Sequence, residues 1–271
     1  MPLTRFLLAT ALALTLAPRA LAASPPAKPP APAPAAPTPP PAPVKATPAQ
    51  RAEAERLPAL AKAAFWAREV DTDQTDGEAR LKLAKSLRAL GRNDEAAAAA
   101  DQLLVMQPNN LEALLESARA RIAEQQGFYA IDPAQRAEAL APRDWRPVSL
   151  LAVALEQSDR DAEALAAHQR ALALAPDNPA TLSNLGMYYA THGDPTKAEP
   201  LLRKAVAAPG ATAQERQNLA LVLGLEGRFD EAEHLQRLDL PPDEVSNNLA
   251  YLHASSDAAS GRTWESLKSA Q

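Results

Sequence analysis

Apolar residues recur along the chain with two spacings, a short helical one and a long one of 34 residues. Leu57, Leu60, Ala64 and Val70 follow helical spacing, which predicts a helix over residues 49–70. Farther along, apolar runs end at Pro108, Pro142 and Pro176, 34 residues apart both times. A fixed period of this length is the signature of a repeat array. It predicts five units of 34 residues over 77–246, starting at Gly77, Leu111, Trp145, Pro179 and Ala213.

Small residues occupy the same two positions in every predicted unit. The eighth position holds Ala84, Ala118, Ala152, Gly186 and Ala220, and the twentieth holds Ala96, Ala130, Ala164, Ala198 and Ala232. Small side chains let two helices approach closely, whereas larger ones would overpack the contact. We therefore predict that each unit is a pair of antiparallel helices and that the fold is an all-α solenoid.

Turn residues separate the two predicted helices of most units. Gly91, Gly193 and Gly227 hold the fifteenth position, where glycine readily adopts a positive φ. The second unit has Gln125 there and carries Pro133 in its second helix. Proline interrupts helix interiors, which predicts a broken or delayed helix; alternatively, Pro133 starts that helix, since proline suits the first helical position.

The two ends of the array need capping elements, because a terminal repeat would otherwise expose its apolar face. Residues 49–76 are expected to form an N-terminal capping helix and linker. Residues 247–271 are assigned to a C-terminal capping helix and tail. The last helix is expected near residues 245–254, with Leu249 and Leu252 on one face.

The N-terminus has the pattern of a secretory signal peptide over residues 1–22. Arg5 precedes a short apolar stretch, and Ala20 and Ala22 fit a cleavage site. We expect a periplasmic protein with no transmembrane helix in the mature chain; the alternative is an uncleaved anchor. Ser24 stands where a lipoprotein would need cysteine. Residues 23–48 form a Pro/Ala-rich linker, interpreted as an extended spacer or as a proline-motif ligand.

Composition narrows the chemistry. The chain has no cysteine, which excludes disulfides and thiolate sites. Its net charge is −5, and it has no cluster of basic residues that would favour nucleic-acid binding. None of the four histidines pairs at a metal-ligand spacing, and no nucleophile or phosphate-loop motif occurs. We therefore predict a protein that is not an enzyme and uses no cofactor or metal.

What remains is a surface for a protein partner. The units resemble tetratricopeptide repeats (TPR), in which positions 2, 5, 6, 9, 12 and 13 face the concave groove. Asn184 and Asn218 share the sixth position, and their amides would suit a peptide backbone; alternatively, each bonds its own neighbouring backbone. Lys82, Lys85 and Arg88 are interpreted as a solvated face rather than a carboxylate clamp. The predicted contacts are Arg146, Ser149, Val153, Ser183, Asn184, Met187, Gln214, Gln217, Asn218 and Leu221.

The last repeat indicates which family of TPR proteins the chain resembles. The run RQNLALVLGLEGRFDEAE over residues 216–233 is followed by DLPP at 239–242 and NNLAYL at 247–252. With APRDW at 141–145 and APDNP at 175–179, these segments resemble the TadD family of tight-adherence (Flp) pilus assembly systems. The resemblance implies an accessory scaffold for the pilus secretion machine, with the outer-membrane secretin or other pilus subunits as partners. The alternative is an adaptor in another envelope process, such as outer-membrane or cell-wall assembly.

Overall fold

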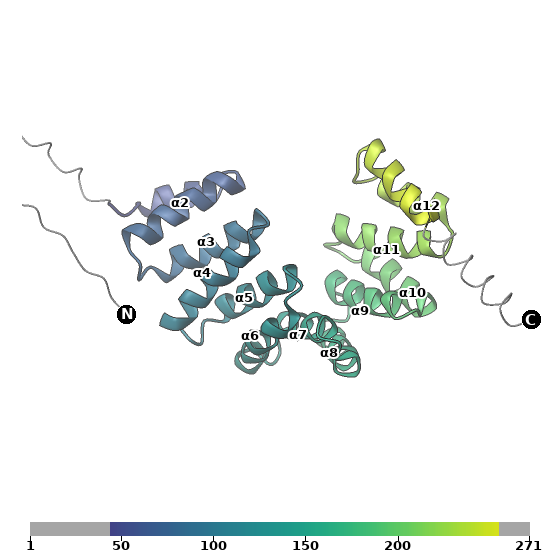
Figure 1. Cartoon of the computed structure of the whole chain (residues 1–271), viewed down its shortest axis with the longest axis horizontal. Coiled ribbons are helices and arrows are strands. Elements are labelled where there is room, and N and C mark those ends of the chain that lie inside the picture. The colour runs from purple at the N-terminus through teal and green to yellow at the C-terminus, as the bar shows by residue number, and fades with distance from the viewer. Residues whose placement is uncertain (1–43, 255–271) are drawn as a thin grey trace, which may run out of the picture. The chain divides into compact units, whose positions relative to one another are not determined.

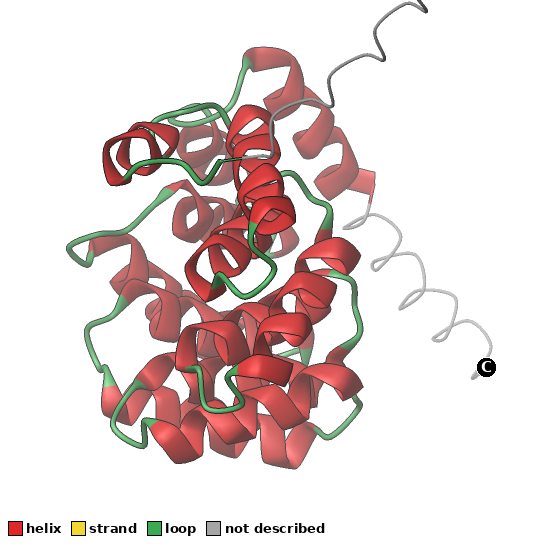
Figure 2. Cartoon of the chain, turned by 90° about the vertical axis from the view of Figure 1, so that its left-hand side faces the viewer, coloured by secondary structure: helices red, strands yellow, loops and turns green. Residues whose placement is uncertain are grey.

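The computed structural model describes residues 44–254, and within them every regular element is a helix (Figures 1 and 2). Twelve helices are followed by a last helical segment over 242–254, so the all-α prediction is confirmed. None of the described helices is both long and apolar enough to span a bilayer. The helices are α1 (Pro48–Ala54), α2 (Ala59–Thr72), α3 (Gly77–Ala89), α4 (Asn93–Met106), α5 (Leu111–Ala123), α6 (Gly127–Leu140), α7 (Trp145–Glu156), α8 (Asp161–Leu174), α9 (Pro179–Thr191), α10 (Pro195–Ala207), α11 (Ala213–Leu225) and α12 (Phe229–Gln236).

The 34-residue period of the sequence is also the period of the helices. The first helices α3, α5, α7, α9 and α11 begin at the five predicted unit starts, and the second helices keep the same spacing. Each first helix packs against its own second helix, and each second helix packs against the next first helix. The pairs therefore follow one another in chain order from α3 to α12 (Figure 1).

Close helix contacts explain the columns of small residues. All five residues of the twentieth position, and the four alanines of the eighth, have an exposed fraction of 0%. At Gly186, a Cβ would lie 2.8 Å from Cγ of Leu202, so no larger residue fits there without displacement. The small side chains are therefore where the two helices of a unit meet.

Two kinds of local signal set the helix boundaries. The fifteenth position has a positive φ in every unit, at 72°, 77° and 79° for Gly91, Gly193 and Gly227, and at 57° and 56° for Gln125 and Asp159. Each first helix is preceded by a side chain that accepts a backbone N–H of its first turn. These N-caps are Asp76, Asn110, Asp144, Asn178 and Thr212.

The second unit corrects one prediction. Helix α6 runs unbroken from Gly127 to Leu140 with Pro133 inside it, so proline neither breaks nor starts the helix. Proline removes the hydrogen bond to the carbonyl four residues earlier, which belongs to Tyr129, and its ring crowds that carbonyl. Ala130 and Ala134 are buried in one cluster with residues of α7, and this packing holds the helix together.

The N-terminal cap also differs from its prediction. Residues 49–70 form two helices, α1 and α2, because Pro58 disfavours the helical conformation of the residue before it. Residues 44–48, assigned to the linker, contact this cap: Lys45 pairs with Asp73 at 2.8 Å and with Asp76 at 2.9 Å.

The C-terminal cap is helical, as predicted, but begins earlier, at residue 242. Val245 and Leu252 are its buried residues, and Leu249 packs against the cluster formed by α10 to α12. The predicted signal peptide at 1–22, the linker residues 23–43 and the tail at 255–271 lie outside the described residues.

Candidate partner-binding surface

The first helices of the repeats share one surface. Neighbouring first helices contact each other in the pairs α3–α5, α5–α7, α7–α9 and α9–α11. Within residues 44–254, second helices of neighbouring repeats make no contact of that extent. The first helices therefore line the inner side of the curved stack. We call concave face the surface formed by positions 2, 5, 6, 9, 12 and 13 of α3, α5, α7, α9 and α11.

The N-terminal half of the concave face is charged and paired with itself. Lys85 and Arg146 each lie 3.0 Å from an oxygen of Glu112, and Arg146 also contacts the N-cap Asp144 at 2.6 Å. Lys85, and then Arg146, hold the pKa of Glu112 below its ordinary value. The hydrogen bonds from Arg146 likewise lower the pKa of Asp144. Arg146, a predicted contact, is thus already bound within the fold.

The other basic residues of this half are also paired. Lys82 lies 3.1 Å from Glu55. Arg88 donates to Glu116, a carboxylate with 0% exposure whose second oxygen lies 3.5 Å from Arg119. The side chains of Lys82, Lys85 and Arg88 are 34%, 38% and 38% exposed, which agrees with a solvated face, and each is paired with a carboxylate of the fold.

Beyond Arg146, the C-terminal half of the concave face has one charged side chain, Glu156 at position 12 of α7, which accepts a hydrogen bond from Thr191 at 3.2 Å. Two further hydrogen bonds join neighbouring repeats. Asn184 Nδ2 donates to Oγ of Ser149 at 2.9 Å, and Asn218 Nδ2 donates to Oγ of Ser183 at 2.9 Å. Both bonds join position 6 of one repeat to position 5 of the preceding one. We call these two pairs the Asn–Ser ladder. The alternative that each asparagine bonds its own neighbouring backbone is therefore wrong.

The ladder fixes which asparagine atoms remain for a partner. Asn218 Oδ1 accepts a hydrogen bond from Gln214 at 2.9 Å, whereas Oδ1 of Asn184 has no donor within the described residues. Ser149 and Ser183 are only 4% and 2% exposed, so they support the asparagines rather than present a surface. The amide of Asn184 is thus fixed in position with its acceptor open.

Apolar side chains run beside the ladder. Val153, Met187 and Leu221 hold the ninth position of α7, α9 and α11 and are half-buried. Apart from Arg146, the predicted contacts on α7, α9 and α11 form one strip of uncharged side chains, which we call the neutral strip. Their role in partner binding stays a prediction. Serine at position 5 followed by asparagine at position 6 of the next unit was the signal for the ladder, and sequence reasoning missed it.

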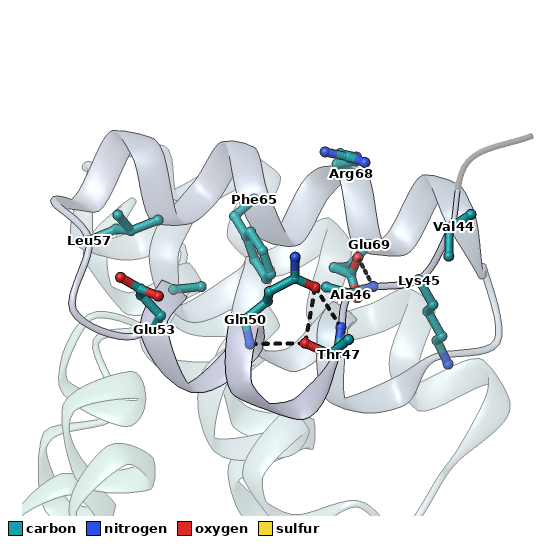
Figure 3. Close-up of a pocket in the computed structure, with 11 residues that line it drawn as sticks. Val44, Lys45, Ala46, Thr47, Gln50, Glu53, Leu57, Phe65, Arg68 and Glu69 are labelled. Atoms are coloured by element: carbon teal, nitrogen blue, oxygen red, sulfur yellow. Dashed lines mark hydrogen bonds between the residues drawn. The ribbon is translucent and has the colours of Figure 1, made fainter. Parts of the chain in front are cut away.

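A further cavity lies outside this strip, between α1 and α2 (Figure 3). It has a volume of about 450 Å³ and includes Phe65, Leu57 and Arg68 in its lining. Its polar groups are largely used internally: Glu69 accepts from the backbone of Ala46 at 3.0 Å, and Gln50 completes the N-cap of α1 with Thr47. Sequence analysis gave no signal for this cavity, because it depends on the turn at Pro58.

Known proteins support the repeat fold. Residues 147–209 match the tetratricopeptide repeat family. A thermophilic TPR protein of Thermus thermophilus has a similar structure, with a TM-score of 0.59 and 24% identity over 66% of this chain and 99% of its own. MamA of Desulfovibrio magneticus gives a TM-score of 0.51 and 22% identity over 58% of this chain and 89% of its own. No curated protein matches the sequence. The chain therefore has an all-α TPR fold, a scaffold suited to protein–protein interaction.

Proposed function

We propose that the neutral strip of α7, α9 and α11 binds an extended, uncharged segment of a protein partner. The observation that carries this proposal is the open Oδ1 of Asn184, held in place by the bond from its own nitrogen to Ser149. A fixed acceptor of this kind suits a backbone N–H of the bound segment, because the ordering cost has been met before binding. The ninth-position column of Val153, Met187 and Leu221 would take apolar side chains of the same segment.

We further propose that the protein works in the bacterial periplasm as a non-catalytic scaffold for assembly of a tight-adherence (Flp) pilus machine. The signal-peptide pattern supports export, and the segments at 216–233, 239–242 and 247–252 support the pilus assignment by resemblance. An outer-membrane secretin or another pilus subunit would be the partner. The second candidate, an adaptor in another envelope process, uses the same surface.

Crosslinking in the native cell envelope, followed by pull-down and mass spectrometry, tests the proposal. The tagged full chain is compared with the double variant Asn184→Ala, Asn218→Ala, which removes both ladder amides. The matched control is Gln135→Ala, Gln169→Ala, which removes two exposed amides from second helices. We expect the ladder variant to recover about tenfold less partner than wild type, the control to recover as much, and circular dichroism to be the same for all three.

The outcomes distinguish the binding role of the concave face from the pilus assignment. Recovery of a secretin or pilus subunits by wild type, and its loss in the ladder variant, supports both the binding role and the pilus assignment. Recovery of other envelope proteins by the same surface keeps the interaction role and overturns the pilus assignment. Equal recovery by the ladder variant and the control would overturn the role of the concave face.

A further inference from the structure

One carboxylate borders the neutral strip without a lysine or arginine beside it. Glu156 is the last residue of α7 and lies about one helical turn beyond Val153, an apolar residue of the strip. Its side chain is 26% exposed, so part of it is accessible to a molecule bound on the concave face. The other glutamates of the concave face are all paired with basic residues: Glu78 with Arg51, Glu112 with Lys85 and Arg146, and Glu116 with Arg88 and Arg119.

The groups that contact Glu156 within residues 44–254 do not supply a permanent positive charge. Thr191 donates to Oε1 at 3.2 Å, and Nε2 of His168 lies 3.4 Å from Oε2. The hydroxyl is neutral, and the imidazole is charged only when it is protonated. Arg160, the nearest arginine along the chain, is paired with Glu163 at 2.7 Å. Because a carboxylate can accept about four hydrogen bonds, Glu156 can accept more from a partner.

The position of Glu156 at the end of α7 also favours an added cation. The last carbonyl groups of a helix carry partial negative charge, which repels an acidic residue and attracts a basic one. Helix α7 has no basic residue in its last turn. A lysine or arginine from outside the helix would therefore interact favourably with the carboxylate and with the helix end together.

Two positive groups near this end could oppose another cation, and both are already bound. Arg146 lies ten residues earlier on α7, about 15 Å along the axis and beyond the screening length of about 8 Å in physiological salt. The ring of His192 lies 2.7 Å from the backbone carbonyl of Tyr188 and 3.4 Å from the carboxylate of Asp161, which offsets its charge when the ring is protonated.

We propose that Glu156 binds the ammonium or guanidinium group of a lysine or arginine that adjoins the uncharged segment of the partner. The neutral strip runs over α7, α9 and α11, and α7 is its end toward the N-terminal half of the array. A segment that lies along the strip would bring the residue at this end beside Glu156. An acidic residue there would be repelled, so the carboxylate also selects among partners. This inference rests on the proposed function, because the strip must hold the uncharged part of the segment.

Peptide libraries test the assignment without the natural partner. The tagged full chain is offered three sets of random uncharged octapeptides, blocked at both termini, which carry lysine, norleucine or glutamate at either end. Retained peptides are quantified by mass spectrometry at about pH 8, above the ordinary pKa of histidine. We expect wild type to retain the lysine set about fivefold more than the norleucine set, as for a partly exposed ion pair, and the glutamate set least. About 1 M salt should largely remove the preference by screening. Equal retention of the three sets at low salt would overturn the proposal.

The variant Glu156→Gln removes the charge and keeps an oxygen that can accept from Thr191. Glu163→Gln on α8 is the matched control, because it changes the net charge equally on a second helix. We expect Glu156→Gln to retain the lysine and norleucine sets equally, the control to keep the fivefold preference, and Tm of Glu156→Gln to be unchanged or higher. A lysine preference that persists in Glu156→Gln would refute the assignment. A Tm several degrees lower would refute it as well, because the carboxylate would then serve the fold through His168.

Failure of this inference and failure of the proposed function give different results. If wild type retains all three sets equally and the ladder variant loses them, the role of Glu156 falls and the concave face stands. If the lysine preference requires Glu156 but the ladder variant retains peptides as well as wild type does, the cation site stands and the role of the ladder falls. If wild type retains no set above the level of resin alone, both proposals fall.

Discussion

Gly127 is the position at which a single methyl group would test the packing of the array. It is the first residue of α6, is buried, and lies against the end of α7. A Cβ there would lie 2.5 Å from Cβ of Gln157 and 2.6 Å from the carbonyl oxygen of Ala154. Ordinary contacts begin at 3.4 Å, so α6 and α7 would have to separate by about 0.8–0.9 Å. Overpacking of this kind costs about 1–3 kcal/mol.

Gly77 provides the matched control because it is the first residue of α3, the corresponding start of another helix. A Cβ there meets mainly Nε2 of Gln107 at 2.5 Å, the movable end of an exposed side chain. Gly77→Ala should therefore leave stability unchanged or raise it by up to about 1 kcal/mol, through the lower entropy of the unfolded chain.

Thermal unfolding followed by circular dichroism compares the two variants with wild type. For a folded region of this size, 1 kcal/mol corresponds to about 2–4 °C in Tm. Gly127→Ala should lower Tm by several degrees, whereas Gly77→Ala should not lower it. Equal melting temperatures for the two variants would refute the close approach of α6 to α7.

Three further predictions concern the packing, the charges and the N-terminal pattern. Ala164→Leu with Ala198→Leu should lower Tm through overpacking of about 1–3 kcal/mol at each site, and an unchanged melting curve would contradict the repeat register. Glu112 has a lowered pKa, so its stabilising contribution should be lost as pH falls below about 4.5. The pKa of His192 is raised, mainly by its bond to a backbone carbonyl and then by Asp161. The stabilising contribution of His192 should therefore be lost as pH rises above about 6.5. Denaturant titrations across pH, with His192→Gln as a control that removes only the upper dependence, would check both signs. Export predicts that the mature protein begins near Ala23, and N-terminal sequencing that finds Met1 would contradict it.

The repeat register could be predicted because its determinants are periodic and local. The alanines of the eighth and twentieth positions mark helix contacts that recur every 34 residues, and Gly91, Gly193 and Gly227 mark turns that need a positive φ. Such signals add over five units, so one irregular unit does not obscure them. The helix pairs and their starts follow from the sequence for this reason.

Single, non-repeated features were harder to predict. Pro133 is tolerated in α6 because Ala130 and Ala134 pack in one cluster with residues of the neighbouring repeat, which the local sequence does not indicate. The division of the N-terminal cap at Pro58 depends on one residue. The Asn–Ser ladder joins residues 35 positions apart, and only the superposition of successive repeats brings them together.

The ladder also connects the fold to the proposed binding. Each of its bonds joins neighbouring repeats, so it holds α7, α9 and α11 in register and orients the asparagine amides at the same time. The charged half of the concave face behaves differently, since Lys85, Glu112 and Arg146 satisfy one another. A partner would have to break those ion pairs to use the charges, at the cost of leaving partly buried groups unpaired. Binding in the neutral half requires no such exchange, because the open acceptor of Asn184 has no protein bond to lose. A polar group that is fixed but not satisfied, the acceptor of Asn184, therefore locates the proposed peptide surface.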